Sequence, residues 1–191
     1  MVFGLNLSGT LNACKLLVNP RLCLPDIVVP TFADLPIPLG PNIKAVVLDK
    51  DNCFAYPHED RVWPAYEATW QRLRVAYPGA RLVIVSNTAG TGDDTDELQA
   101  RALERNTGVA VLRHATKKPG CKTEVLSYLY EQQVVNSPEE VAVVGDRLLT
   151  DMVMARQMGA YGVWVRDGVR PSNSPIVAFE KRLYEYLRPD N

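Results

Sequence analysis

Several apolar runs in the sequence are each followed by side chains that could act on a phosphate ester. In chain order these side chains belong to Asp49 and Asp51, Ser86 and Asn87, Lys118, and Asp146 and Asp151. Ligands of open α/β sheets bind beyond the carboxyl ends of the strands, where residues that directly follow the strands meet. We therefore predict that these carboxylates, the hydroxyl, the amide and the lysine surround one site.

The carboxylates indicate a metal ion. Asp49 and Asp51 stand two residues apart, and together with Asp146 they would repel one another in a dry cleft unless a cation or a proton lay between them. Mg²⁺ fits best, because it prefers oxygen ligands, keeps several of its waters and commonly works beside phosphate. Asp49, Asp51 and Asp146 are the predicted metal ligands.

The same residues favour hydrolysis of a phosphate ester. A carboxylate can attack phosphorus and form an aspartyl phosphate, which divides the reaction into two easier steps, and Asp49 at the tip of its strand is the predicted nucleophile. Asp51 would protonate the leaving oxygen and later activate water, a role worth about 10²–10⁴-fold in rate. The predicted phosphate-binding residues, which would stabilise charge on the phosphoryl oxygens, are Ser86, Asn87 and Lys118.

Strands and helices must alternate along the chain to position these residues. Short runs that are nearly continuous in Val, Ile and Leu have the composition of strands covered on both faces. They span residues 45–48, 82–85, 109–112, 141–144 and 162–165. Helices are predicted between and after them, at 65–76, 94–106, 122–132, 150–157 and from Ser174-Pro175 onward. The pattern predicts a doubly wound, Rossmann-like parallel α/β sheet.

Apolar stripes mark a helix near each end of the chain. Near the N-terminus, the apolar residues of segment 3–18 recur at helical spacing and carry almost no charge, which is typical of a helix that lies on a membrane surface. Packing of this helix on the core or on another subunit is the alternative. The C-terminal helix is predicted to pack against the sheet through Ile176, Phe179, Leu183 and Leu187.

The first forty residues differ in composition from the rest. They are poor in charge and rich in Leu, Val and Pro, which favours an appendage rather than a strand of the sheet. We therefore divide the chain into an N-terminal segment, 1–42, and a catalytic domain, 43–191. The sequence leaves the oligomeric state open.

Composition narrows the class of protein further. A net charge of −1 lacks the basic surplus that nucleic-acid binding requires, so no nucleic-acid partner is expected. No apolar run reaches the ~18–20 residues of a membrane span, and no secretory signal is evident. The 4 cysteines lack metal-ligand spacing, which indicates free thiols in a reducing compartment.

In order and position, these segments resemble the four motifs of the haloacid dehalogenase (HAD) superfamily of phosphatases. The segments LDKDNC, VSNTAG, KKPGC and GDRLLTD are similar, more narrowly, to those of the mitochondrial phosphatidylglycerophosphatase family of fungi and plants. The resemblance covers about residues 43–166. Asn52 and Cys53 depart from the wider superfamily and fit the narrower family.

This resemblance implies roles for individual residues. Asp49 would be the nucleophile and Asp51 the acid and base, while Ser86 and Lys118 would bind phosphate and Asp146 would bind the metal. Asp151 would support the metal's waters or orient Lys118. Lys118 is preferred to its neighbour Lys117 because it precedes Pro119, as the family's lysine does.

The resemblance also implies a substrate and a location. The substrate would be phosphatidylglycerophosphate, converted to phosphatidylglycerol for cardiolipin synthesis at the matrix side of the mitochondrial inner membrane, where the protein would be peripheral. The intervals between the motifs are too short for a cap domain, so the site can accept the phosphate end of something large. A phosphoprotein or soluble phosphoester is the alternative substrate. A phospho-receiver signalling domain is a more distant alternative, because its phosphorylated Asp follows the third strand rather than the first.

Overall fold

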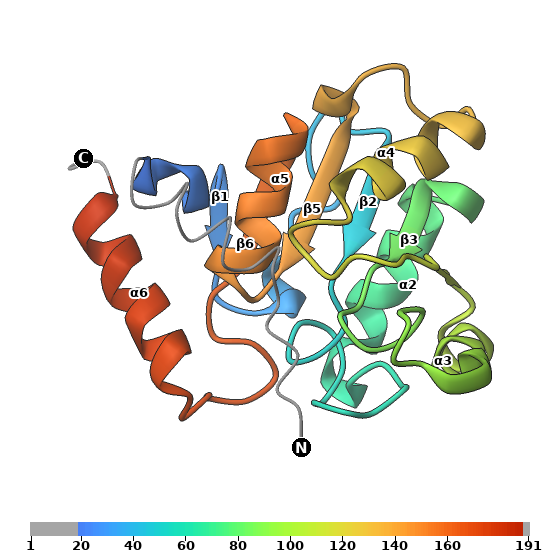
Figure 1. Ribbon diagram of the computed structural model, residues 1–191, viewed down its shortest axis with the longest axis horizontal. Coiled ribbons are helices and arrows are strands. Elements are labelled where there is room, and N and C mark those ends of the chain that lie inside the picture. The colour runs from blue at the N-terminus through green and yellow to red at the C-terminus, as the bar shows by residue number, and fades with distance from the viewer. Residues whose placement is uncertain (1–18, 189–191) are drawn as a thin grey trace.

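Strands of a single parallel sheet form the centre of the computed structural model, which describes residues 19–188 (Figure 1). The strands are β1 (Ile27–Val29), β2 (Ala45–Leu48), β3 (Leu82–Ile84), β4 (Ala110–Val111), β5 (Val141–Gly145) and β6 (Tyr161–Val165). Their order across the sheet is β1-β6-β5-β2-β3-β4, and every pairing is parallel. The predicted doubly wound α/β fold is confirmed.

Helices follow the strands much as the sequence predicts. The α-helices are α2 (Glu67–Ala76), α3 (Leu98–Thr107), α4 (Lys122–Glu131), α5 (Val153–Met158) and α6 (Pro175–Leu187). A π-helical turn, η7 (Leu148–Met152), leads into α5. Short 3₁₀ turns complete the connections, at Pro20–Cys23, Phe32–Asp34, Pro64–Tyr66, Gly79–Arg81, Thr95–Glu97 and Pro138–Glu140.

The sheet is covered on both faces, which explains why its central strands are apolar throughout. Val46 and Leu48 of β2 pack in the core cluster that contains the buried faces of α2 and α3. Val47, which points the other way, packs in the cluster formed with α4 and α5. Figure 1 shows α4 and α5 in front of the sheet. All four residues of β2 are buried, so the strand that leads into Asp49 is held rigidly.

The segment before residue 42 contains a strand that the sequence analysis placed outside the sheet. Ile27–Val29 pair in parallel with Val163–Val165 of β6, and Phe32 is fully buried in the central core. The prediction of an appendage without a strand is therefore wrong in this respect. Prolines flank this strand of only three residues, so its composition concealed it. The predicted boundary at residue 42 itself stays a prediction.

Helix α6 packs against the sheet through only part of its predicted stripe. Leu183 and Leu187 lie against the cluster around Trp164. Ile176 and Phe179 are instead 47% and 55% exposed. The helix contacts the domain mainly through its C-terminal half, and its first turns therefore leave these two side chains open to solvent.

The predicted N-terminal helix, 3–18, lies outside the described residues, so its membrane role stays a prediction. Within the described part of the chain, no helix has the length and apolar character needed to cross a bilayer.

Candidate active site

Asp49 and Asp146 lie side by side at the ends of two neighbouring strands. β2 pairs with β5, with Leu48 opposite Val144, and the backbone N–H of Asp49 donates to the Val144 carbonyl at 2.8 Å. Asp146 directly follows β5. The parallel register therefore brings both carboxylates to the same edge of the sheet, as the sequence predicts.

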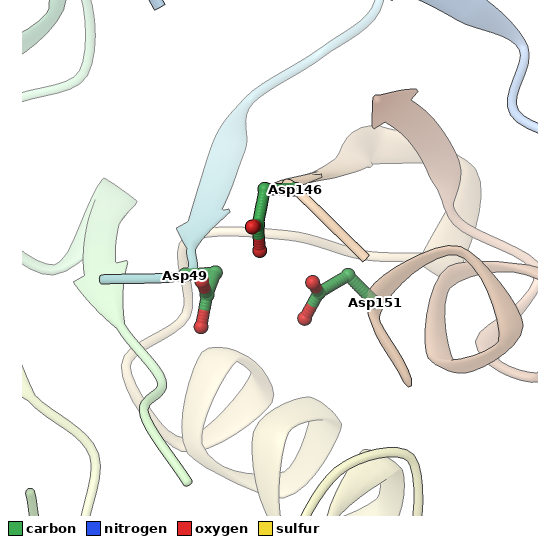
Figure 2. A group of neighbouring side chains, drawn as sticks. All are labelled: Asp49, Asp146 and Asp151. Carbon is green, nitrogen blue, oxygen red and sulfur yellow. The ribbon is translucent and has the colours of Figure 1, made fainter. Parts of the chain in front are cut away.

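Asp151 joins these two residues from the π-helical turn η7. Its Oδ2 accepts a hydrogen bond from the backbone N–H of Arg147 at 3.1 Å, and the residue is 1% exposed. Figure 2 shows Asp49, Asp146 and Asp151 turned toward a common space. One carboxylate oxygen from each lies within 4.8 Å of the others. The structure thus gives Asp151 a place among the clustered carboxylates, where the sequence analysis gave it a supporting role.

Gly145 makes room for Asp151. A Cβ atom built at Gly145 would overlap the carboxylate carbon of Asp151, at a separation no real Cβ shows. Glycine at position 145, directly before Asp146, is therefore required for steric reasons, because it allows the Asp151 side chain to lie across the end of β5.

We expect Gly145→Ala to displace Asp151 from the cluster and to destabilise the fold by about 1–3 kcal/mol, the usual cost of overpacking. Thermal unfolding and phosphatase assays would measure both effects. Gly92→Ala is the matched control, because no described atom lies within 4 Å of its added Cβ. Wild-type activity and stability in Gly145→Ala would show that the strand end can accommodate the methyl group.

Lys118 is buried between two of the carboxylates. The residue is 2% exposed, and its Nζ pairs with Asp49 and, at 2.7 Å, with Asp151. Its backbone N–H donates to Oδ1 of Asn87 at 2.8 Å, which fixes the segment that carries it. Lys117 points elsewhere and pairs with the exposed Asp93. Of the two lysines, Lys118 is the one at the candidate site.

Burial and neighbouring charges together shift the pKa values of these groups. Burial raises the pKa of Asp49 to about 6, although Lys118 draws it down. Burial also raises the pKa of Asp146, and the charges of Asp49 and Asp151 add to this effect. Burial alone would lower the pKa of Lys118, but the two neighbouring carboxylates outweigh it and hold that pKa above its usual value. Lys118 is therefore positively charged at neutral pH.

The cluster has the properties of a site for a hard metal ion. Asp49, Asp146 and Asp151 offer carboxylate oxygens only, and a single lysine neutralises part of their charge. An excess of buried negative charge is costly unless a cation or protons compensate it. The donor set fits Mg²⁺, which takes oxygen ligands.

Asp51 lies in the same pocket but outside this cluster. Its Oδ1 accepts hydrogen bonds from the Lys50 ammonium and from the backbone N–H of His58 at 2.8 Å. Its side chain lines the pocket, where a bound ester could reach it. Its predicted roles as metal ligand and as acid and base stay predictions.

Ser86 lies at the end of β3 but does not line the pocket in the described structure. It is fully buried, and its hydroxyl is hydrogen-bonded to the Thr88 hydroxyl at 3.0 Å and accepts from the Thr88 backbone N–H at 3.1 Å. Asn87, the next residue, does line the pocket. The predicted phosphate contact of Ser86 stays a prediction.

The pocket has a volume of about 260 Å³ and contains residues that sequence reasoning missed. Arg147 lies within the GDRLLTD segment and forms an ion pair of 2.7 Å with the buried Glu180 of α6. Arg170 comes from the loop that follows β6. No motif marks Arg170, because only the return of that loop across the strand ends brings it to the pocket.

Comparisons with known proteins show which family the chain resembles. The family model described as "Mitochondrial PGP phosphatase" matches residues 7–170. The chain is 58% identical to "Phosphatidylglycerophosphatase GEP4, mitochondrial" of Saccharomyces cerevisiae, over 96% of this chain and 99% of that one. It is 32% identical to "Probable phosphatidylglycerophosphatase, mitochondrial" of Schizosaccharomyces pombe, over 98% and 95% of the two chains. It is 31% identical to an Arabidopsis thaliana "Phosphatidylglycerophosphate phosphatase 1, chloroplastic/mitochondrial", over 94% of this chain and 51% of that protein.

Proposed function

The chain belongs to the mitochondrial PGP phosphatase family, and from this membership we propose that it removes the terminal phosphate of phosphatidylglycerophosphate to leave phosphatidylglycerol, a precursor of cardiolipin. Family membership makes the chain a phosphatase rather than a phospho-receiver domain. The observation that carries the proposed chemistry is the convergence of Lys118 with the carboxylates of Asp49, Asp146 and Asp151. The order of the sequence motifs supports HAD-type chemistry at this site.

Asp49 is the proposed nucleophile. With a pKa of about 6, its carboxylate is mostly ionised at neutral pH and can attack phosphorus. The bond from phosphorus to the glycerol oxygen breaks as the aspartyl phosphate forms, and Asp51 donates a proton to the departing oxygen. Asp51 then takes a proton from water, which attacks the aspartyl phosphate and releases inorganic phosphate. Lys118, charged and buried, stabilises the phosphoryl oxygens in both steps.

Asp49, Asp146 and Asp151 would hold Mg²⁺, with Asp51 as the further ligand that the sequence predicts. When bound, the ion neutralises charge on the phosphoryl oxygens. Asn52 orients Asp146, because its Nδ2 donates to Oδ2 of Asp146 at 3.2 Å.

The proposed location is the matrix side of the mitochondrial inner membrane, where the protein would be peripheral. The names of the relatives support a mitochondrial location. The N-terminal segment 3–18 would supply the membrane contact through its apolar stripe. Exposed Ile176 and Phe179 flank Val177, which lines the pocket, and this placement supports an approach of the pocket to a lipid surface.

We expect deletion of residues 1–18 to weaken liposome binding at least tenfold while hydrolysis of a soluble aryl phosphate changes about twofold or less. The apolar side chains of this segment would supply several kcal/mol of membrane affinity, at ~25 cal/mol per Å². Co-sedimentation with anionic liposomes measures the first quantity and steady-state kinetics the second. Equal liposome binding by the shortened and full chains would end the membrane role of the segment.

A comparison of substrates tests the proposed function. We expect kcat/KM for phosphatidylglycerophosphate in mixed micelles to exceed that for phosphopeptides, glycerol 3-phosphate and aryl phosphate. Higher kcat/KM for a phosphopeptide or a soluble ester would keep the phosphatase chemistry and assign the site to the alternative substrate class.

A further inference from the structure

The loop that follows β6 carries a cation to the mouth of the active-site pocket. Arg170 lines the pocket together with Asp49, Lys118 and Asp146. Its side chain is exposed, so a ligand can reach it from solvent. Arg170 therefore lies at the rim, whereas the catalytic carboxylates lie at the base of the pocket.

Among residues 19–188, no carboxylate neutralises the charge of Arg170. Of the cations that line the pocket, Lys118 pairs with Asp49 and Asp151, and Arg147 pairs with Glu180. Asp167, the acidic residue nearest in sequence, pairs with Arg166 and Lys181 instead. Arg170 has no carboxylate within 4.0 Å among residues 19–188, which leaves its guanidinium free to bind an anion.

Tyr56 holds the Arg170 side chain in place through two contacts. Its Nη1 donates to the Tyr56 hydroxyl at 2.9 Å, and the guanidinium carbon lies 4.9 Å from the centroid of the same ring. This arrangement fixes part of the guanidinium, which reduces the ordering cost of binding an anion. Within the described part of the chain, the other N–H groups of the guanidinium donate no hydrogen bond.

The backbone of this loop is connected to Asp146 through Asn52. The Arg170 N–H donates to Oδ1 of Asn52 at 3.1 Å, while Nδ2 of Asn52 donates to Asp146 at 3.2 Å. The Val169 N–H donates to the Asn52 carbonyl at 2.9 Å. Gly168, at φ +66°, lies so close to Asn52 that a Cβ atom would overlap its side chain. Arg170 is thus held at a set position relative to the phosphate-reacting groups.

We propose that Arg170 binds the phosphodiester of the lipid headgroup while the terminal phosphate of the same headgroup occupies the Asp49 site. This inference rests on the proposed function. The two phosphates of phosphatidylglycerophosphate stand at opposite ends of one glycerol, and guanidinium groups bind phosphate oxygens in a forked geometry. Arg170 is accordingly a specificity-determining residue: it favours a glycerol phosphorylated at both ends over an isolated phosphomonoester.

The test compares Arg170→Gln with wild type on phosphatidylglycerophosphate in mixed micelles, its soluble deacylated headgroup, and p-nitrophenyl phosphate. In Arg170→Gln, we expect kcat/KM for the lipid and for its deacylated headgroup to fall at least about tenfold more than kcat/KM for the aryl phosphate. The fall should come mainly from a higher KM. Arg170→Lys, which keeps the charge but not the fork, should recover part of the loss. Thermal unfolding of each variant establishes that it is folded.

Arg166→Gln is the matched control. It removes one positive charge from the same exposed loop, but its guanidinium pairs with Asp167 at 2.8 Å and is not part of the pocket lining. We expect wild-type kinetics on all three substrates. The control separates recognition of the diester from general attraction to an anionic micelle.

Other outcomes would overturn the inference. If kcat/KM fell equally for all three substrates, Arg170 would act on the reacting phosphate rather than on the diester. If kcat/KM fell for none of them, Arg170 would have no role in substrate recognition. A loss on the micellar lipid without a loss on the deacylated headgroup would assign it to surface binding. If wild type cleaves p-nitrophenyl phosphate but neither glycerol substrate, the proposed function fails, and this inference fails with it.

Discussion

Asp49→Asn should yield a folded protein whose phosphate release is reduced by about 10⁴-fold or more. An amide of the same shape cannot attack phosphorus, so both steps of the reaction lose their covalent route. The substitution keeps the buried volume, and Lys118 keeps its partner Asp151 at 2.7 Å. Steady-state kinetics with phosphatidylglycerophosphate and with aryl phosphate would measure the loss, and thermal unfolding would show that the fold persists.

Asp93→Asn is the control for this substitution. Asp93 is an exposed aspartate that pairs with Lys117 and does not line the pocket, so its loss should leave turnover within about twofold of wild type. If Asp49→Asn retained a tenth of wild-type turnover, another group would have to be the nucleophile.

Lys118→Ala should lower kcat by about a hundredfold to a thousandfold. Loss of a preorganised charge that stabilises the transition state commonly has an effect of this size. The removal also leaves the carboxylates of Asp49 and Asp151 buried without their shared cation. Buried negative charge without a compensating cation is costly, which favours protonation of these carboxylates. We expect the apparent affinity for phosphate, measured as product inhibition, to weaken in parallel.

The adjacent lysine provides a stringent comparison. Lys117→Ala removes the same charge one residue earlier, from a side chain that pairs with exposed Asp93. We expect nearly wild-type kinetics. Similar losses in the two variants would mean that the segment contributes through its general positive charge rather than through the position of Lys118.

The sequence predicted the central strands and the residues that follow them at the site, because both leave local signals in the sequence. Runs such as 45–48 and 141–144 are buried on both faces and therefore nearly all apolar, and the residues after them must meet at one edge. β1 left no such signal, because its three residues sit among prolines at the edge of the sheet.

The sequence pattern could not show which aspartates form the carboxylate cluster, because that depends on the local conformation of the backbone. Asp51 and Asp151 were both recognised, but the direction of each side chain follows from its turn. The turn after β2 leads Asp51 toward Lys50 and His58, whereas the π-helical turn and Gly145 bring Asp151 to Asp49. These directions are set by backbone conformation and by one steric requirement.

Arg170 and the exposed turns of α6 could not be predicted, because both depend on contacts between distant segments. Arg170 reaches the pocket through hydrogen bonds from its loop to Asn52 and Tyr56, which lie more than a hundred residues earlier. The apolar stripe of α6 is regular in sequence, yet only its C-terminal residues Leu183 and Leu187 pack on the core, and Phe179 stays exposed.

Phosphate release from phosphatidylglycerophosphate in mixed micelles, measured with and without Mg²⁺, tests the central claim most directly. We expect wild-type protein to release phosphate only when Mg²⁺ is present, and Asp49→Asn to release none under either condition. Undiminished release in the presence of a chelator would contradict the metal dependence inferred from the carboxylate cluster. Release from aryl phosphate but not from the lipid would contradict the proposed substrate.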